Sequence, residues 1–218
     1  MRVASTAYIA PNVTLGKDVD IGQFSVIGQP PRGFVEGELS TSIGDNAVIR
    51  SHSVVYAGNT IGAYFETGHG VSIRECNSIG DHVSIGTHSI IEHHVVIEDR
   101  VRIHSNVFIP EFSILHCDCW IGPCVTVTNV LHPKCPRAKD CMKGVEIGEN
   151  AIIGANVTIL PDVYIAPWCL VGSGSLVTKS LLDSGVYVGS PCKKIMEISE
   201  ISCRYHIIDH PYLRGDES

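Results

Sequence analysis

The chain contains no run of about 18 apolar residues, the shortest stretch expected of a membrane-spanning helix. Its first residues, Met1 to Thr6, carry no apolar signal region. Positive charge is scarce, because 16 Lys and Arg stand against 23 Asp and Glu, and the net charge is −7. Without a basic stripe to neutralise phosphates, nucleic acid is not expected as the main partner. We therefore expect a soluble cytoplasmic protein with no membrane partner.

A disulfide framework is also missing. The chain has nine Cys, an odd number, and they do not follow the spacing of a small secreted scaffold. Reduced thiols in a reducing compartment are expected. With 218 residues, of which 44% are apolar, the chain can bury one core in one domain.

What the sequence does contain is a period of six residues. From Ile43 to His132 there are 15 consecutive hexads, and 14 of them begin with Ile, Val or Leu, with Thr67 as the exception. A helix needs spacings of three and four, and a free strand needs alternation, so a period of six indicates a solenoid. Four earlier hexads from Ile9 and six later ones from Ile147 extend the pattern.

The first and fifth positions of each hexad are predicted to point inward, because the fifth is mostly small or branched. Three hexads make a triangular coil of 18 residues, so Asn59 and Asn77, both at fifth positions, should stack. We predict a short internal ladder in which each side-chain amide bonds its neighbour. The histidines of the central repeat all avoid the inward positions, and most are expected at the surface or at a subunit interface.

Two insertions interrupt the period, at about residues 29–42 and 133–144. Loops of this kind are where solenoids place binding residues. We predict a repeat domain over residues 1–190 and a C-terminal cap and tail over 191–218, with a short helix from Met196 to about His206. That helix would cover the open end of the solenoid.

The pattern of an aliphatic residue, Gly or an acidic residue, two variable positions, a small residue and one more resembles the left-handed parallel β-helix of hexapeptide-repeat acyltransferases. The expected fold class is therefore all-β. The resemblance implies an enzyme that takes an acyl group from a coenzyme A or carrier thioester, works as a homotrimer and has active sites between adjacent prisms. Fold alone does not fix function.

His132 is the first candidate for a catalytic base. The run T-x-x-x-H-P, which ends in His132 and Pro133, resembles the catalytic His-Pro of hexapeptide acetyltransferases acting on sugars. His titrates near neutral pH, as a general base should. Asn129 could hold the substrate or the thioester carbonyl. Both could equally be ordinary turn residues.

The segment from Val48 to Glu75 resembles sugar-nucleotide N-acetyltransferases, and this implies acetyl transfer to the amino group of a UDP- or dTDP-linked amino sugar in polysaccharide synthesis. Alternatively, Arg74 and Glu75 form a solvated rung on the outer face. The expected substrate-binding residues are His69, Arg74, Glu75 and His94. Acetyl-coenzyme A would lie along the late coils, and its expected contacts are Gly154, Gly172, Lys179, Pro191, Lys193 and Lys194.

Other functions stay open at this point. Sugar O-acetylation is one, and a β-helix that only organises a complex is another. His132, Cys135 and Cys141 form H-x2-C-x5-C, which would suit a structural zinc site. His52, His88 and His93 resemble the three zinc ligands of γ-class carbonic anhydrases, although an Arg-x-Asp run and a Gln-Asp pair expected of that family are missing. The leading interpretation includes no metal.

Overall fold

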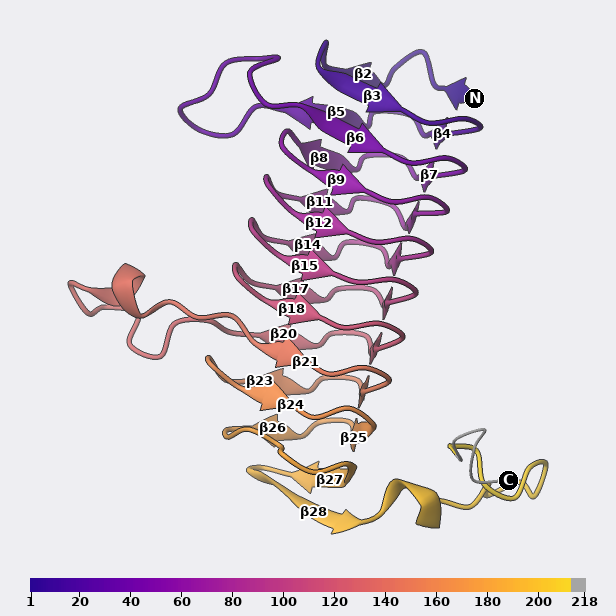
Figure 1. Cartoon of the computed structure of the whole chain (residues 1–218), viewed down its shortest axis with the longest axis vertical. Coiled ribbons are helices and arrows are strands. Elements are labelled where there is room, and N and C mark those ends of the chain that lie inside the picture. The colour runs from indigo at the N-terminus through magenta and orange to yellow at the C-terminus, as the bar shows by residue number, and fades with distance from the viewer. Residues whose placement is uncertain (213–218) are drawn as a thin grey trace.

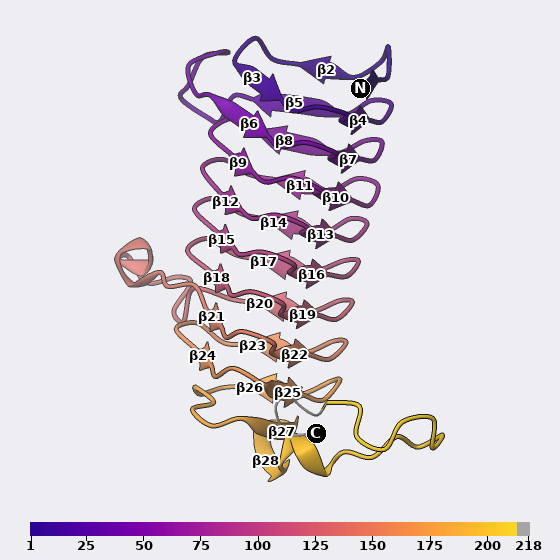
Figure 2. The ribbon, with the colours of Figure 1, turned by 45° about the vertical axis from the view of Figure 1, so that its right-hand side comes forward.

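The computed structural model describes residues 1–212 as a straight, three-sided prism of short strands (Figures 1 and 2). Strands of successive coils pair in parallel, for example Ile73 with Ile91 and Ile79 with Ile97. Each coil therefore advances by 18 residues, as the sequence predicts. The fold is the left-handed β-helix of hexapeptide repeats.

Each side of the prism is one sheet. Face 1 contains β1 Arg2–Val3, β4 Asp20–Ile21, β7 Val48–Ile49, β10 Glu66–Thr67, β13 Ser84–Ile85, β16 Arg102–Ile103, β19 Trp120–Ile121, β22 Ile152–Ile153, β25 Cys169–Val171, β27 Gly185–Gly189 and β28 Cys192–Met196. Face 2 contains β2 Tyr8–Ile9, β5 Val26–Gln29, β8 Val54–Tyr56, β11 Ser72–Ile73, β14 Ile90–Ile91, β17 Phe108–Ile109, β20 Thr126–Val127, β23 Thr158–Ile159 and β26 Leu176–Val177. Face 3 contains β3 Val13–Leu15, β6 Thr41–Ile43, β9 Thr60–Ile61, β12 Ser78–Ile79, β15 Val96–Ile97, β18 Ile114–Leu115, β21 Glu146–Ile147 and β24 Tyr164–Ile165.

The core is built from the first and fifth positions of the hexads, which are buried along the prism. Phe65 is the largest side chain at a fifth position and is fully buried, so the interior accepts more than the small residues that dominate this column. In most hexads the residue before the fifth position has positive φ, as in His82 (58°), His88 (58°) and His94 (57°). Asn, Asp and His tolerate this left-handed region better than most residues, which gives a structural reason for several of the histidines.

The ladder of Asn59 and Asn77 is present, but its bonds differ from the prediction. The Asn77 backbone N–H donates to Asn59 Oδ1 at 2.8 Å, and the Val95 N–H donates to Asn77 Oδ1 at 2.7 Å. Both Nδ2 groups donate to the carbonyl of Arg74, each at 2.8 Å. Each amide thus bonds backbone groups of its own corner and of the next coil, instead of the next amide.

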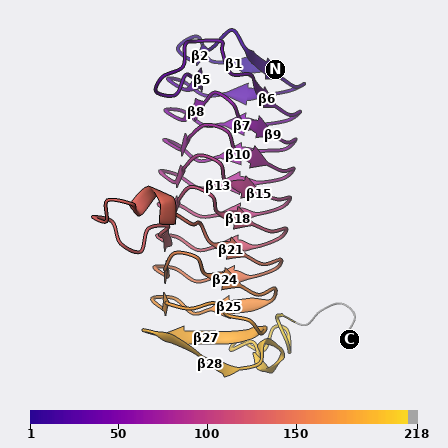
Figure 3. The ribbon, with the colours of Figure 1, turned by 60° about the vertical axis from the view of Figure 1, so that its left-hand side comes forward.

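The C-terminal end departs from the predicted helix. β27 and β28 form an antiparallel hairpin, and the helical structure between 196 and 206 is a single 3-10 turn, Ile198–Glu200. Ile198 is buried in this turn, whereas Ile195 is 57% exposed. A second 3-10 turn, Ala138–Cys141, lies in the second insertion, which stands off the prism (Figure 3). In the described residues no helix is long and apolar enough to cross a membrane. Residues 213–218 of the predicted tail lie outside the described part.

Candidate functional site

Both insertions leave the prism at the same edge, where the chain passes from face 2 to face 3. The first follows β5 and the second follows β20 (Figures 1 and 2). We call this edge the loop edge, made of residues 56–58, 74–76, 92–94, 110–112 and 128–130. The chain passes from face 1 to face 2 over a second edge, the glycine edge, made of residues 50–52, 68–70, 86–88, 104–106, 122–124, 154–156 and 172–174.

A column of polar side chains runs along the loop edge, one from each coil. Glu75, His93, Glu111 and Asn129 are 18 residues apart, so they stack at the strand separation of about 4.8 Å. Asn129 Nδ2 donates to Glu111 Oε2 at 2.7 Å, and Glu111 Oε1 lies 3.6 Å from His93 Nε2. Asn129 is 9% exposed. The stacking therefore links residues of three coils into one network.

Arg74 joins this column to its neighbours. Its guanidinium donates to Glu75 through Nε (2.9 Å) and Nη2 (3.1 Å), and to Glu92 through Nη1 (3.4 Å). It also lies 4.9 Å above the ring of Tyr56. These contacts hold the guanidinium in place as a counter-charge for two carboxylates, while 31% of the Arg74 side chain stays exposed.

The two carboxylates on Arg74 have opposite pKa shifts. Burial favours a higher pKa for Glu75, but the hydrogen bonds and charge of Arg74 outweigh it, and the pKa of Glu75 lies below its ordinary value. Burial raises the pKa of Glu92 above its ordinary value, and the negative charges of Glu111 and Glu75 raise it further against Arg74. The loop edge therefore carries more negative charge than Arg74 neutralises.

His93 and His94 form a hydrogen-bonded pair on this edge. Their Nδ1 atoms are 2.8 Å apart, and both rings contact Phe112. One Nδ1 must carry the proton and the other must accept it. A proton on His94 Nδ1 leaves His93 with its proton on Nε2, where it faces the carboxylate of Glu111. This tautomer pair gives His94 an unprotonated Nε2, which is able to take up a proton.

His132 lies on the second insertion, three residues beyond Asn129, and is exposed. Its carbonyl accepts from the Cys135 N–H at 3.0 Å, while its side chain has no hydrogen bond or ion pair with any of residues 1–212. The structure thus brings Asn129, Arg74, Glu75 and His94 together on the loop edge, with His132 in the loop that starts there. The catalytic assignment of His132 and Asn129 stays a prediction.

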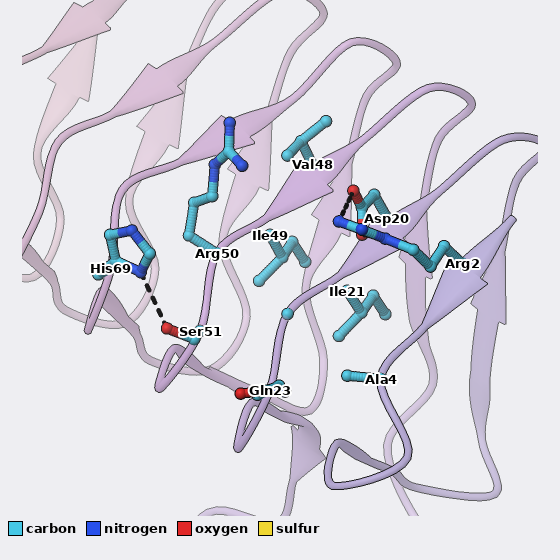
Figure 4. Close-up of a pocket in the computed structure, with 11 residues that line it drawn as sticks. Arg2, Ala4, Asp20, Ile21, Gln23, Val48, Ile49, Arg50, Ser51 and His69 are labelled. Carbon is cyan, nitrogen blue, oxygen red and sulfur yellow. Dashed lines mark hydrogen bonds and ion pairs between the residues drawn. The ribbon is translucent and has the colours of Figure 1, made fainter.

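His69 lies on the glycine edge, away from the other expected substrate-binding residues. Its Nδ1 is 2.9 Å from Ser51 Oγ (Figure 4). Gly154 and Gly172 belong to the same edge, where coils approach closely. A Cβ on Gly154 would lie 2.6 Å from the backbone nitrogen of Ser173, and one on Gly172 would lie 2.7 Å from Val188 Cγ1. Coil stacking is therefore enough to require Gly154, whereas a side chain on Gly172 would meet the partly exposed side chain of Val188 on β27.

The remaining expected coenzyme contacts lie near the C-terminal end. Lys179 is exposed just after β26, on the way to face 3. Pro191 lies in the turn of the terminal hairpin, and Lys193 and Lys194 lie on β28. Lys194 Nζ is 2.7 Å from Glu197 Oε1, so Lys179 and Lys193 are the cations without such a partner in this group.

Neither alternative metal site is complete within residues 1–212 of one chain; the γ-class resemblance implies ligands drawn from adjacent chains of a trimer, so the three-His alternative stays a prediction. His52 and His88 lie on the glycine edge, whereas His93 lies on the loop edge. Cys135 and Cys141 are exposed in the second insertion. In residues 1–212 of one chain, no three His, Cys, Asp or Glu side chains are placed to hold a metal ion.

Sequence reasoning missed Glu92, Glu111 and the role of His93 in this network. For Glu92 the available signal was the 18-residue column at the second position of the hexads. That column is glycine at 68, 86 and 122 on the glycine edge and at 44, 62 and 80 on the third edge, where the chain passes from face 3 to face 1, but Tyr56, Arg74 and Glu92 occupy it on the loop edge. Long side chains thus take the place of glycine at this position on the loop edge. For His93 and Glu111 the signal was the third-position column that also contains Glu75 and Asn129.

Comparisons with known proteins agree with this architecture. The profile of the bacterial transferase hexapeptide family (six repeats) matches residues 78–111 and 144–179. A galactoside O-acetyltransferase from Lactococcus lactis subsp. lactis (strain IL1403) is 40% identical over 83 residues, which cover 36% of this chain and 40% of that protein. The galactoside O-acetyltransferase of Escherichia coli (strain K12) is 38% identical over 66 residues, covering 30% of this chain and 32% of that protein.

Among solved structures, a UDP-N-acetylglucosamine acyltransferase from Campylobacter jejuni aligns with 99% of this chain and 80% of that chain, at 18% identity and a TM-score of 0.49. The chain spans less than half the length of the two galactoside O-acetyltransferases that it matches.

Proposed function

Since the chain belongs to the superfamily of hexapeptide-repeat acyltransferases, we propose that it transfers acetyl from acetyl-coenzyme A to the amino group of a UDP- or dTDP-linked amino sugar. In the reaction the amine attacks the thioester carbonyl, an amide forms and the coenzyme A thiol leaves. No acyl-enzyme is required, because the nucleophile belongs to the substrate.

The acidity of the loop edge is the observation that carries the choice of an amine. Glu75, Glu92 and Glu111 lie on three successive coils, and Arg74 is the one arginine or lysine in the described residues of the loop edge. A surface with this excess of negative charge attracts a protonated amino sugar from solution, whereas a neutral hydroxyl gains nothing from it. The ammonium must then lose a proton before it attacks, which calls for a base at the same edge.

Two histidines are placed to be that base. His132 is exposed at the start of the second insertion, and Asn129 below it offers an amide to the substrate or to the thioester oxygen. His94 supplies the second candidate, because its Nε2 is free to accept a proton when the shared proton of the His93–His94 hydrogen bond is on His94 Nδ1. Acetyl-coenzyme A would lie along the late coils toward Lys179 and Lys193.

The proposed assembly is a homotrimer with active sites between adjacent prisms. In one chain His69, Gly154 and Gly172 lie on the glycine edge, while Arg74, Glu75 and His94 lie on the loop edge. Face 2 separates these two edges, so both groups can serve one site when the loop edge of one prism lies next to the glycine edge of another. This division of the candidates supports a site shared between chains.

Sugar O-acetylation is the second candidate, because the relatives from Lactococcus lactis and Escherichia coli are galactoside O-acetyltransferases. A hydroxyl has a far higher pKa than an ammonium group, and a neutral hydroxyl is a weaker nucleophile than a neutral amine, so this reaction depends more strongly on a general base.

A thiol-release assay with acetyl-coenzyme A and matched acceptors tests the proposal. Each UDP- or dTDP-linked amino sugar is paired with the sugar that carries a hydroxyl at the same carbon. We expect turnover with an amino sugar, and a fall of about 100-fold in kcat for His132→Ala if His132 is the base. His82→Ala, an exposed histidine on the third edge, serves as the matched control. Turnover with hydroxyl acceptors alone would establish O-acetylation, and no thiol release with any acceptor would refute both transferase proposals.

A further inference from the structure

Two adjoining cavities lie on face 1 beside the glycine edge. Their volumes are about 320 Å3 and 360 Å3, and Arg50 and His69 line both. Figure 4 shows the first cavity, where Arg50 extends on the same side as His69 while Arg2 is joined to Asp20. Together the cavities form a groove that crosses β4, β7, β10, β13 and β16.

The floor of this groove follows from the sequence of the glycine edge. Gly68 and Gly86 occupy the second positions between Arg50 and His104, and a Cβ on either would collide with the backbone of the next coil. At the second position, two coils thus present glycine, and the long side chains of Arg50 and His104 bound them at the two ends. Three coil steps separate Arg50 from His104, a distance of about 14 Å at the usual strand spacing.

The groove contains two unpaired guanidinium groups. Arg50 and Arg102 are exposed, and neither forms an ion pair with a carboxylate in residues 1–212. Arg2 differs, since it is held by both oxygens of Asp20. Counting Glu66, the lining has three arginines and two carboxylates, so it is locally positive in a chain whose net charge is −7.

Two imidazole nitrogens of residues that line the groove have no hydrogen-bond partner among the described residues. His104 Nε2 is buried and has no hydrogen-bond partner among the described residues, although buried polar atoms are nearly always satisfied. The His69 ring is held through Nδ1 by Ser51, which leaves Nε2 for the groove. These nitrogens lie near the two arginines, His69 beside Arg50 and His104 two residues from Arg102.

We propose that this groove binds the diphosphate of the nucleotide-linked acceptor, with Arg50 and Arg102 contacting the phosphates and His69 and His104 completing the site. The inference deepens the proposed function by placing its acceptor. Guanidinium forks match phosphate oxygens in geometry and charge. Arg74, which is bound to Glu75 and Glu92, stays a candidate for contacting the sugar.

Equilibrium binding to the full-length protein tests the site without requiring any acetyl transfer. The probes are inorganic pyrophosphate, UDP, dTDP and free coenzyme A, whose own diphosphate is the competing source of the same chemistry. The variants are Arg50→Gln, Arg102→Gln and Ser84→Glu, which places a carboxylate between Glu66 and Arg102. Arg100→Gln makes the same charge change at an exposed ion pair on the third edge. Thermal unfolding checks that each variant is folded.

We expect each groove variant to weaken UDP or dTDP binding about 10-fold, and pyrophosphate binding in proportion, while coenzyme A binding stays within about twofold. Arg100→Gln should bind all probes as the wild type does. The proposal is overturned if the nucleoside diphosphates bind equally well to the variants, if they do not bind the wild type at all, or if coenzyme A alone loses affinity. Arginine-dependent UDP binding without acetyl transfer would refute the proposed function and leave the groove assignment standing.

Discussion

Replacing Asn77 by alanine perturbs the ladder that fixes the loop edge from inside. The side chain accepts from the Val95 N–H at 2.7 Å and donates to the Arg74 carbonyl at 2.8 Å. That carbonyl also accepts from Asn59 Nδ2 at 2.8 Å, so it stays satisfied when Asn77 is truncated. The single variant therefore leaves one buried group without a partner, the N–H of Val95.

The expected loss follows from this count. An unsatisfied buried N–H costs about 1–3 kcal/mol, so Asn77→Ala should lower the free energy of unfolding by about 2 kcal/mol. Asn59→Ala should cost at least as much, because it removes both the acceptor of the Asn77 N–H and the donor to the Tyr56 carbonyl. The double variant also leaves the Arg74 carbonyl unsatisfied, and its loss should exceed the sum of the two single losses by about 1 kcal/mol or more.

Urea unfolding supplies the global free energies, and hydrogen exchange of peptides covering residues 74–97 supplies the local ones, which matters because solenoids do not always unfold in one step. Ser78→Ala, an exposed residue on β12, is the matched control and should change stability by less than about 0.5 kcal/mol. Additive losses in the double variant, or losses in Asn77→Ala no larger than in the control, would show that the shared carbonyl does not couple the two amides.

Two further predictions concern the charges of the loop edge and the glycines of the late coils. The pKa of Glu75 is lowered in the fold, so its ionised form stabilises the folded protein above the ordinary carboxyl pKa of about 4.3. This stability is lost as pH falls through the folded pKa. Glu75→Gln should therefore lower Tm at pH 7 but hardly at pH 3. The pKa of Glu92 is raised, so stability falls as pH rises past that ordinary value, and Glu92→Gln should gain Tm relative to wild type between pH 4 and pH 7. Scanning fluorimetry across pH measures both, and equal slopes for the two variants would contradict the opposite signs. Gly154→Ala should lower Tm because its Cβ meets Ser173, whereas a pure loss of coenzyme A affinity at unchanged Tm would show that the coenzyme, not stacking, requires the glycine.

The fold was predictable because one period governs the whole chain. A first-position residue every six places fixes the coil, and 18-residue spacing fixes which residues stack, as Ile73 and Ile91 show. The ends were less predictable, because pairing there has no periodic signal. The hairpin of β27 and β28 had no signal in the period, a single 3-10 turn at Ile198–Glu200 stands where the helix from Met196 was expected, and an additional strand, Arg2–Val3, pairs with β4 at the start.

The candidate site was predictable only in part, for a reason that lies in the same geometry. Functional side chains occupy outward positions, where the period imposes no residue type. Arg74 and Glu75 are adjacent in sequence and stand out together, whereas Glu111 and Asn129 are 18 residues apart and meet only after the coils stack. Partners of this kind become visible when the sequence is written in columns of 18 instead of 6.

The two edges differ in charge, and this difference bears on how one substrate could occupy both. The loop edge is acidic around Glu92 and Glu111, which suits the ammonium of an amino sugar, and the groove beside the glycine edge is positive around Arg50 and Arg102, which suits its diphosphate. Face 2 lies between these edges in one chain. In the proposed trimer the two opposite charges of one nucleotide-linked amino sugar would be bound by two different chains, so a single prism would hold the diphosphate without presenting the amine to the acidic edge.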